Sequence, residues 1–393
     1  MEQIDICQLL SCALQGKQLM VHAEAEEIVK IADRHKVLAL LYELSEGDSL
    51  SPYLKSYVQQ KSRQTVQQSY RLLFLTKYLV KLFEEQGIHP VVLKGCSAAV
   101  LYPVPELRKS GDIDILISKD CDMENIERVL ESAQMKKEKE QWSVHHQVFA
   151  TIEGIKIELH TMPTEPFENE KLNRYIKKVT PGFFQHIEYR EIMGVSLPVL
   201  EDAYQAYQLL LHMLQHFLTA GFGLRLLCDW VVFWNRPLSK EIQDTFLHLV
   251  NESQICGFAE MVTKACILYL GLKEDKVQFM FQNKEPDVVQ VKEFMTEIFA
   301  AEEFGQSDPT RMVTLQGTKL RDYFHQFHHQ MKLTYPRSSK CIFTWPVLWI
   351  MMFFGFVYRN RRRRNISTIS ILKEAGRRSR MIESMNLFKE KDR

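Results

Sequence analysis

The segment 112–117, with the sequence DIDILI, constrains the fold of this chain more than any other feature. Neighbouring residues of a β-strand point to opposite faces, and residues two apart share a face with Cα atoms roughly 6.6 Å apart. Asp112 and Asp114 are therefore expected side by side, and the other face is expected to pack into a core through Ile113, Ile115 and Ile117. Two carboxylates this close repel each other, so they favour a bound divalent cation or a raised pKa.

A second element precedes this strand. Residues 91–93 predict a short apolar strand, which runs into Lys94-Gly95-Cys96-Ser97. A glycine turn followed by a small hydroxyl residue can offer backbone N–H groups and the Ser97 hydroxyl to phosphate oxygens. Each part alone has a simpler explanation, because Asp-x-Asp can end a solvated strand and Lys-Gly is a common turn. Their order along the chain favours metal-assisted phosphoryl or nucleotidyl transfer.

Residues 145–160, HHQVFATIEGIKIELH, predict a β-hairpin with a two-residue loop at Glu153-Gly154. The expected buried face consists of Val148, Ala150, Ile152, Ile155, Ile157 and Leu159. The expected opposite face consists of His145, Gln147, Phe149, Lys156, Glu158 and His160. Glu158 is thus a third carboxylate on a strand whose other face is apolar. The alternative is a solvent-facing residue on an edge strand.

Four motifs together resemble a known family. LKG at 93–95, LYP at 101–103, Arg108 shortly before DIDIL, and ELH at 158–160 are similar to an uncharacterised bacterial nucleotidyltransferase family. That family lies within the DNA polymerase β-like nucleotidyltransferase superfamily. The resemblance is specific over residues 91–160, weaker to Trp230 and faint beyond. The chain departs from the superfamily pattern at Cys96, where Gly or Ser is usual, and in its long spacer of fifteen residues, 97–111.

The resemblance implies a set of site residues. Asp112 and Asp114 would hold one or two Mg²⁺ (or Mn²⁺) ions that bridge the phosphates of a nucleoside triphosphate such as ATP. Glu158 would complete the second metal site or accept the proton of an attacking hydroxyl. The expected contacts to nucleotide or substrate are Lys94, Gly95, Ser97, Arg108 and His160. Lys94 and Arg108 could instead be surface charges, and His160 a hydrogen-bonded structural residue.

The predicted function is therefore metal-dependent transfer of a nucleoside monophosphate from an NTP to a hydroxyl of a small molecule or protein. A non-catalytic nucleotide- or peptide-binding module is the alternative, favoured by Cys96. The net charge of +1 and the lack of a basic groove near the motif disfavour long nucleic acid as the acceptor. The sequence defines neither the acceptor nor the base of the nucleotide.

Composition predicts a cytoplasmic protein of two or three parts. The eight cysteines form no Cys-x-x-Cys pair and no signal peptide is recognisable, which favours reduced thiols without a structural zinc site. The expected fold class is α+β, with a small mixed β-sheet nucleotidyltransferase core at 89–200. An N-terminal helical region at 1–88 and a mostly helical C-terminal region at 201–393 are expected to flank it and to pack with it into one body.

Local patterns predict several further elements. Residues 60–86 and 122–132 are expected to be helices, the first ending at Gly87, and 186–199 two short strands turning at Met193-Gly194. In the helical region, four polar residues stand one helical turn apart in pairs: His212 and His216, then Arg225 and Asp229. Spacing alone allows a helix ion pair for the second pair and supports a metal site for the first only weakly. The family resemblance includes both pairs and implies that they line the substrate cleft.

Residues 341–358, CIFTWPVLWIMMFFGFVY, carry no charge and precede the arginines at 359 and 361–364. A buried or groove-lining helix is the first interpretation, because Pro346 and Gly355 interrupt the run. Peripheral membrane contact through 341–364 and a short membrane span are the alternatives. The arginine run could also contact phosphates of an acidic partner.

Overall fold

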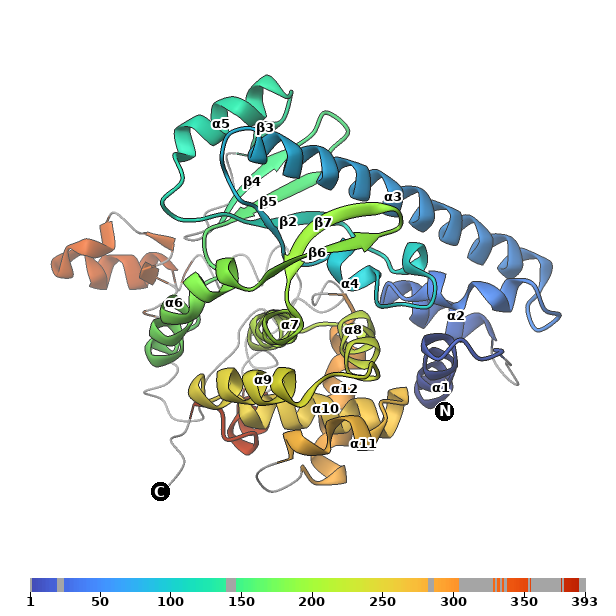
Figure 1. Cartoon of the computed structure of the whole chain (residues 1–393). Coiled ribbons are helices and arrows are strands. Elements are labelled where there is room, and N and C mark those ends of the chain that lie inside the picture. Colours follow the sequence, from blue (N-terminus) through green and yellow to red (C-terminus); the bar gives the residue numbers. More distant parts are fainter. Residues whose placement is uncertain are drawn as a thin grey trace.

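The fold is built on one mixed β-sheet, which lies in the upper half of Figure 1. The computed structural model describes residues 2–19, 25–138, 146–281, 286–303, parts of 328–354 (328, 331–332, 334–335, 338–352 and 354), 376 and 378–388. Within these residues the sheet has seven strands in the order β3-β4-β5-β2-β1-β7-β6. The strands are β1 (Val91–Val92), β2 (Asp112–Leu116), β3 (Lys136–Lys137), β4 (His146–Ala150), β5 (Lys156–His160), β6 (Ile187–Ile192) and β7 (Val195–Leu200).

Two pairs of neighbouring strands are parallel, β2 with β5 and β1 with β7, and the other pairs are antiparallel. The chain thus has the α+β architecture and the mixed sheet that the sequence predicted. Strand β5 lies between β4 and β2, so it is an interior strand. The hairpin of β6 and β7 turns at Met193 and Gly194, whose φ angles of 47° and 79° are typical of a type I′ turn, as predicted.

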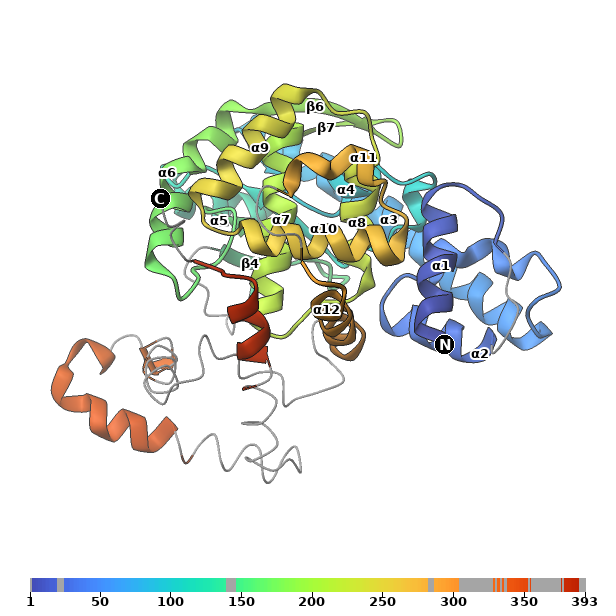
Figure 2. The same ribbon diagram turned by 90° about the horizontal axis from the view of Figure 1, so that it is seen from below.

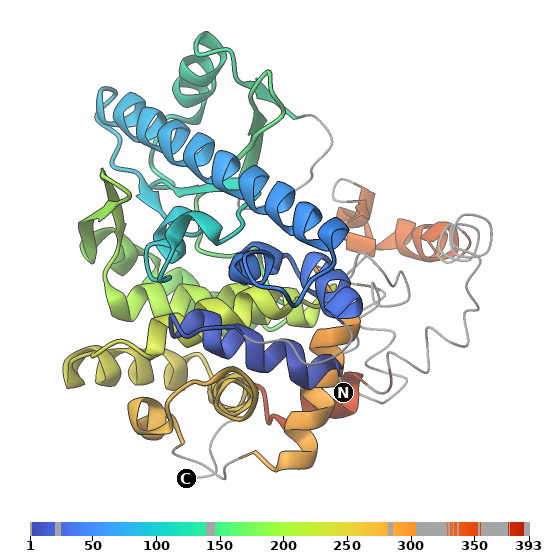
Figure 3. The same ribbon diagram turned by 90° about the vertical axis from the view of Figure 1, so that its right-hand side faces the viewer.

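Helices cover both faces of the sheet (Figure 3). One face packs against the long helix α3 (Pro52–Glu84) and α5 (Met123–Ser132). The side chain of Ser51 caps α3 by accepting a hydrogen bond from the Leu54 N–H, and Asp122 caps α5 in the same way. Both helices were predicted from the sequence, and Gly87 follows the end of α3 with a φ of +72°. The other face points towards α7 (Asp202–Leu218) and α8 (Leu224–Trp234).

The remaining helices complete the body around α7 and α8 (Figures 1 and 2). They are α1 (Glu2–Leu14), α2 (Ala25–Arg34), α4 (Cys96–Ala99), α6 (Glu170–Gln185), α9 (Lys240–Glu252), α10 (Cys256–Leu270), α11 (Glu274–Val277) and α12 (Val288–Ala301). Short 3₁₀ segments are η1 (Leu38–Ser45), η2 (Pro105–Leu107), η3 (Gln278–Met280), η5 (Ser338–Lys340) and η6 (Ile342–Thr344). The largest apolar core joins α1 and α2 to α7, α8 and α10. The predicted boundaries at 88 and 200 stay a prediction.

The hairpin of β4 and β5 corrects one expectation. Ala150 pairs with Lys156 and Phe149 with Ile157, so five residues, 151–155, form the connection instead of two. Gly154 adopts a φ of +81°, and the Thr151 side chain accepts a hydrogen bond from the Ile155 N–H. Strand β4 is therefore turned over relative to the prediction: Phe149 is fully buried and Ile152 is 77% exposed. The orientation of β5 is as predicted, and His145 lies outside the described residues.

The described part of the apolar segment 341–358 is not a buried helix. Its helical residues project from the main body (Figure 2), and only one side packs, through Leu348 and Met352 against Met331. The other side exposes Phe343, Val347, Ile350, Met351 and Phe354. Among the described residues, no helix combines the length and the apolar character that crossing a bilayer requires. The arginines at 359 and 361–364 lie outside the described residues.

A short segment near the C-terminus, 378–388, holds the end of α7. The buried Arg378 guanidinium donates hydrogen bonds to the carbonyl oxygens of Phe217 (2.5 Å) and Thr219 (3.3 Å). Its Nε lies 3.6 Å from a Glu297 carboxylate oxygen. A cation at a helix C-terminus satisfies carbonyls that have no partner within the helix. The segment thereby fixes the helix that faces the sheet.

Candidate active site

The acidic residues predicted from the sequence lie on one face of two adjacent strands. In the parallel register of β2 and β5, Asp114 stands opposite Glu158 and Asp112 opposite Lys156. The intervening Ile113 packs with Ile115 and Ile117 into the core under α3 and α5. The shared face of the three carboxylates and the buried face of the isoleucines are as predicted. The alternative of an edge strand for Glu158 is wrong, because β5 has a neighbour on each side.

Two basic side chains contact Asp114. The Lys94 Nζ lies 2.8 Å from Asp114 Oδ1, and His160 Nε2 lies 2.9 Å from the same oxygen. His160 Nε2 is also 3.5 Å from Glu158 Oε2. Ligand atoms of Asp114, Glu158 and His160 all lie within 4.8 Å of one another. Asp112 is outside this tight group and lies two residues before Asp114 on the same face of β2.

The electrostatics of the cluster are asymmetric. The negative charge of Asp114, followed by burial, raises the pKa of Asp112 to about 6. Burial alone would raise the pKa of Asp114, but the Lys94 ammonium and the His160 ring hold it well below its usual range. Burial opposes the charge of Lys94, yet Asp114, Asp112 and Glu158 together raise its pKa. The Lys94 ammonium and the hydrogen bond with His160 therefore favour the ionised form of Asp114.

The acids line a cavity of about 410 Å³ between the sheet and helices α7 and α8. Its lining combines the acidic face with basic and histidine side chains from segments far apart in the sequence. The polar lining residues are Lys36, Lys94, Arg108, Lys109, Ser110, Asp112, Asp114, Glu158, His212, His216, Arg225, Asp229 and Glu303. Glu158 retains 21% exposure, so the cluster is accessible from the cavity.

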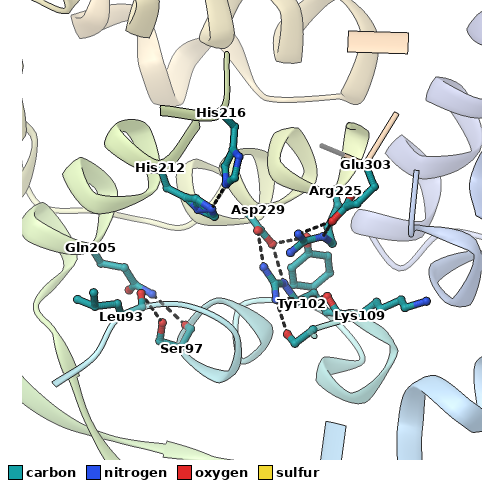
Figure 4. A network of polar contacts seen from close by, with 12 residues as sticks. Leu93, Ser97, Tyr102, Lys109, Gln205, His212, His216, Arg225, Asp229 and Glu303 are labelled. Carbon is teal, nitrogen blue, oxygen red and sulfur yellow. Dashed lines mark hydrogen bonds and ion pairs between the residues drawn. The ribbon is translucent and has the colours of Figure 1, made fainter. Parts of the chain in front are cut away.

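Arg108 is engaged by a residue of α8. Its Nε and Nη2 bond Asp229 Oδ1 and Oδ2 at 3.0 and 2.6 Å, and its Nη1 donates to Ser110 Oγ at 2.5 Å. The Tyr102 hydroxyl also donates to Asp229, at 2.7 Å (Figure 4). Arg108 and Asp229 are 3% and 1% exposed. The pair fixes the loop before β2 on α8, and a phosphate contact for Arg108 stays a prediction.

The turn before α4 contributes backbone to the cavity. Gly95 adopts φ +66° and ψ −104°, a conformation that favours glycine, and it lines the cavity beside Lys94. Ser97 lies behind this wall and is 1% exposed. Its hydroxyl donates to the Leu93 carbonyl at 3.1 Å, and its own carbonyl accepts from Gln205 at 2.9 Å (Figure 4). The predicted phosphate contact of Ser97 stays a prediction.

The histidine pair of α7 faces the same cavity. His212 Nε2 and His216 Nε2 are 2.8 Å apart (Figure 4). Burial and then the charge of Lys94 lower the pKa of His216 to about 3 and that of His212 well below its usual value. Both rings are therefore neutral at pH 7, and one donates to the other. Arg225 contacts Glu303 at 2.6 Å. His212, His216, Arg225 and Asp229 thus all line the cavity, as the family resemblance implied.

Three lining residues carried no signal in their local sequence. Lys36 follows α2, Lys109 precedes β2, and Glu303 follows α12, so only the three-dimensional fold brings them together. Lys109 was the most accessible to prediction, because it adjoins Arg108 in the family motif. No periodicity or spacing connects Lys36 or Glu303 to the acidic strand.

The donor set suits a hard divalent cation. Carboxylate oxygens of Asp112, Asp114 and Glu158 on one face match the preference of Mg²⁺ for a few carboxylates completed by water and substrate oxygens. The imidazole of His160 adds a nitrogen donor, which Mn²⁺ accepts more readily than Mg²⁺ does. Lys94 already places positive charge against Asp114. The residues present therefore fit a cation at this point, with Lys94 as its competitor.

A family profile described as uncharacterised nucleotidyltransferase matches residues 22–271, well over half of the 393 residues. The crystal structure of an antigenic nucleotidyltransferase-like protein from Paracoccidioides brasiliensis is 15% identical, with 54% of this chain and 97% of that chain covered and a TM-score of 0.31. A search of proteins with curated descriptions finds no significant match. From the profile match, which includes both acidic strands and the histidine pair, we conclude that this chain belongs to the family of uncharacterised nucleotidyltransferases.

Proposed function

We propose that this protein is a metal-dependent nucleotidyltransferase that uses an NTP and a hydroxyl acceptor on a small molecule or protein. The observation that carries the proposal is the parallel register that sets Asp114 opposite Glu158, with Asp112 on the same face of a 410 Å³ cavity. Three carboxylates that face a cavity repel one another, and a bound cation would offset the repulsion that Lys94 leaves. Membership of the nucleotidyltransferase family supports the same chemistry.

In the proposed reaction the acceptor oxygen forms a bond to the α-phosphorus as the bond from the α-phosphorus to the bridging oxygen of the β-phosphate breaks. Pyrophosphate leaves with the electron pair of that bond. Glu158 accepts the proton of the attacking hydroxyl, with His160 3.5 Å away to orient its carboxylate. A divalent cation held by Asp112, Asp114 and Glu158 would neutralise charge on the phosphate oxygens. Lys94 and Gly95 lie beside the acids, where the triphosphate would approach.

The direct test is pyrophosphate release from each of the four common NTPs with Mg²⁺ or Mn²⁺, supplied with candidate hydroxyl acceptors. Asp112→Asn and Asp114→Asn should each lower the rate about 100-fold or more, because even outer-shell metal partners are worth 10–100-fold. Glu153→Gln is the matched control, since it removes an exposed acid from the loop of the same hairpin. Circular dichroism and the thermal midpoint confirm that the variants are folded.

A non-catalytic nucleotide-binding role is the remaining candidate for this fold, and Cys96 is the feature that favours it. Cys96 is buried, with a pKa raised by burial, and packs with Val92 and Leu197. An NTP that binds with metal but yields no pyrophosphate under any acceptor condition would replace the enzymatic proposal by this one. The superfamily assignment and the cytoplasmic location stay predictions.

We further propose peripheral membrane contact through the apolar stripe, defined as Phe343, Val347, Ile350 and Phe354. These positions recur at helical spacing and are all exposed. The five arginines at 359 and 361–364 follow in the sequence, so an anionic lipid surface matches both the apolar and the cationic parts.

A further inference from the structure

The cavity that holds the acid cluster adjoins a second one. This neighbour measures about 240 Å³ and is lined by Lys36, Lys61, Lys109 and Asp33, together with glutamines of α3. Lys36 and Lys109 also line the 410 Å³ cavity. The two hollows therefore meet at this lysine pair, and a substrate held at the acids can extend past Lys36 and Lys109 into the second cavity.

Positive charge is in excess where the cavities meet. Lys61 lies 3.5 Å from Asp33, and Asp33 also accepts a hydrogen bond from the Tyr57 hydroxyl at 2.7 Å. Within the part of the chain that the structure describes, the ammonium groups of Lys36 and Lys109 have no hydrogen-bond or ion-pair partner. Figure 4 shows the Lys109 side chain directed away from Asp229 and Tyr102. Among the described residues, Asp33 is therefore the one carboxylate that lines the second cavity with the three lysines, and Glu303, in the first cavity, is paired with Arg225.

Neither unpaired lysine is fully solvated. Lys36, Lys61 and Lys109 are all partly buried. Burial, followed by the charge of Lys36, lowers the pKa of Lys109. Bringing like charges together at a partly buried position is unfavourable unless an anion offsets them.

The backbone conformation of Lys36 determines which substitution tests this site. Lys36 has a φ of +57° at the end of α2, where the Val37 N–H donates to the Ala32 carbonyl at 2.9 Å. This is the helix-terminating position at which glycine is strongly preferred, and a residue with a Cβ is strained there. A lysine at this position sacrifices local stability and places an ammonium group at the cavity junction.

We propose that Lys36, Lys61 and Lys109 form a subsite for a substrate phosphate group at the junction of the two cavities. The subsite deepens the proposed nucleotidyltransferase function and rests on it for the identity of the substrates. The phosphate belongs either to the triphosphate tail of the NTP or to a phosphorylated acceptor.

The test uses two variants of the full chain and one matched control. Lys36→Gly removes the ammonium and relieves the strained backbone, so its thermal midpoint should equal or exceed that of the wild type. Lys109→Gln removes the second ammonium. Gln134→Gly makes the same conformational change at a φ of +63° after α5, on the opposite side of the sheet, and removes no charge.

The probe is inorganic pyrophosphate, followed by isothermal titration calorimetry at fixed ionic strength. We expect Lys36→Gly and Lys109→Gln each to weaken its binding about tenfold, the loss of one charge-assisted phosphate contact. Gln134→Gly should bind as the wild type does.

A non-hydrolysable ATP analogue with Mg²⁺ then distinguishes the two sources of the phosphate group, the triphosphate tail and the acceptor. An equal loss of analogue affinity assigns the subsite to the triphosphate tail. Unchanged analogue affinity, with lysine-dependent binding of inorganic phosphate to the analogue-loaded protein, assigns it to the acceptor.

Unchanged binding of pyrophosphate and phosphate in both lysine variants, with or without the analogue, overturns the subsite. Because these measurements need no turnover, their result is separate from that of the transferase assay. If phosphate binding depends on the lysines but the protein has no transferase activity, the subsite proposal stands and the nucleotidyltransferase proposal is rejected. If transferase activity is present but neither it nor phosphate binding depends on the lysines, the nucleotidyltransferase proposal stands and the subsite proposal is rejected.

Discussion

Arg108 and Asp229, 121 residues apart in the sequence, form a bidentate ion pair in the wall of the candidate active site. The pair connects the loop before the acidic strand β2 to helix α8. Both side chains are almost completely buried, and Tyr102 and Ser110 complete their hydrogen bonds. A buried polar contact therefore joins the loop that leads into the acidic strand to helix α8.

We predict that Asp229→Leu lowers the free energy of unfolding by about 3–5 kcal/mol, because it leaves the Arg108 guanidinium buried without its partner. The double variant Arg108→Met/Asp229→Leu should recover much of this loss. Urea denaturation followed by circular dichroism measures both. Glu26→Gln, which breaks the exposed 2.7 Å pair with Lys30, is the control and should cost less than about 1 kcal/mol. A similar small loss for Asp229→Leu would contradict the structural role of the pair.

Lys94 competes for the position of the proposed metal. We predict that Lys94→Met raises the affinity for Mn²⁺ in the absence of nucleotide by about three- to tenfold, because it removes a positive charge 2.8 Å from Asp114. The same variant should lower NTP turnover, since Lys94 lies where the triphosphate approaches. Electron paramagnetic resonance of free Mn²⁺ reports the affinity. Lys137→Met, which removes a lysine paired with Glu127 at the sheet edge, is the control. Weaker Mn²⁺ binding by Lys94→Met would mean that Lys94 organises the acids rather than competing with the metal.

His35 should make stability depend on pH. Burial, followed by the charge of Arg34, lowers its pKa to about 4 in the folded protein, and its Nδ1 accepts a hydrogen bond from the Leu224 N–H at 3.3 Å. In the unfolded chain the pKa is about 6.5. The unfolded state therefore takes up a proton first as the pH falls. The contribution of the neutral His35 ring to the free energy of unfolding is complete above pH 6.5. About 3 kcal/mol of this contribution is lost between pH 6.5 and pH 4.

Urea denaturation across this pH range tests the prediction. His35→Gln should be less stable than the wild type at pH 7.5, and it should lose less stability on acidification. His248→Gln, at an exposed position of α9, should leave the slope as in the wild type. Identical slopes for His35→Gln and the wild type would show that the ring is not kept neutral by the fold.

The apolar stripe gives a prediction about membranes. Full-length protein should sediment with vesicles that contain phosphatidylserine, and the quadruple serine variant of the stripe should lose most of this binding. Raising the salt concentration should weaken binding by the wild type, because the arginine run interacts with the lipid charge. Tyr53→Ser, at an exposed aromatic position on α3, serves as the control. Unchanged vesicle binding by the stripe variant would exclude a lipid contact through the stripe. If the variant loses self-association instead, the stripe forms a contact between copies of the chain.

The acidic face could be predicted because it depends on local geometry alone. Alternation along β2 determines which side chains accompany Asp112, and the same rule gave the orientation of Glu158 on β5. Helix α5 and the turn at Met193 and Gly194 were likewise predicted from local sequence patterns. These features need only a few consecutive residues.

The complete lining of the cavity could not be predicted from local patterns, because it is built from long-range contacts. Asp229 is one helical turn from Arg225 and suggested a local ion pair, yet its buried partner is Arg108. Tertiary burial selects the bidentate partner over the local one. Lys36 and Glu303 reach the site only through the packing of α2 and α12, for which the sequence offers no pattern.

The orientation of β4 could not be predicted for a different reason. The choice between a two-residue and a five-residue connection is a matter of one register step, and each step reverses the faces of a strand. Glu153-Gly154 favoured the shorter loop, but the burial of Phe149 against Ile157 outweighs it. The observed register buries both Val148 and Phe149 and exposes Ile152 in the loop.

The register of β5 against β2 has a consequence for how the proposed activity is acquired. Glu158 and Ile157 are neighbours on β5, so a strand shifted by one position would bury the carboxylate and expose the isoleucine. A misaligned hairpin would then be both unstable and inert, with no partly competent form between. The proposed transferase activity should thus return during refolding in step with the shielding of Phe149 from water, as a single event rather than a gradual one.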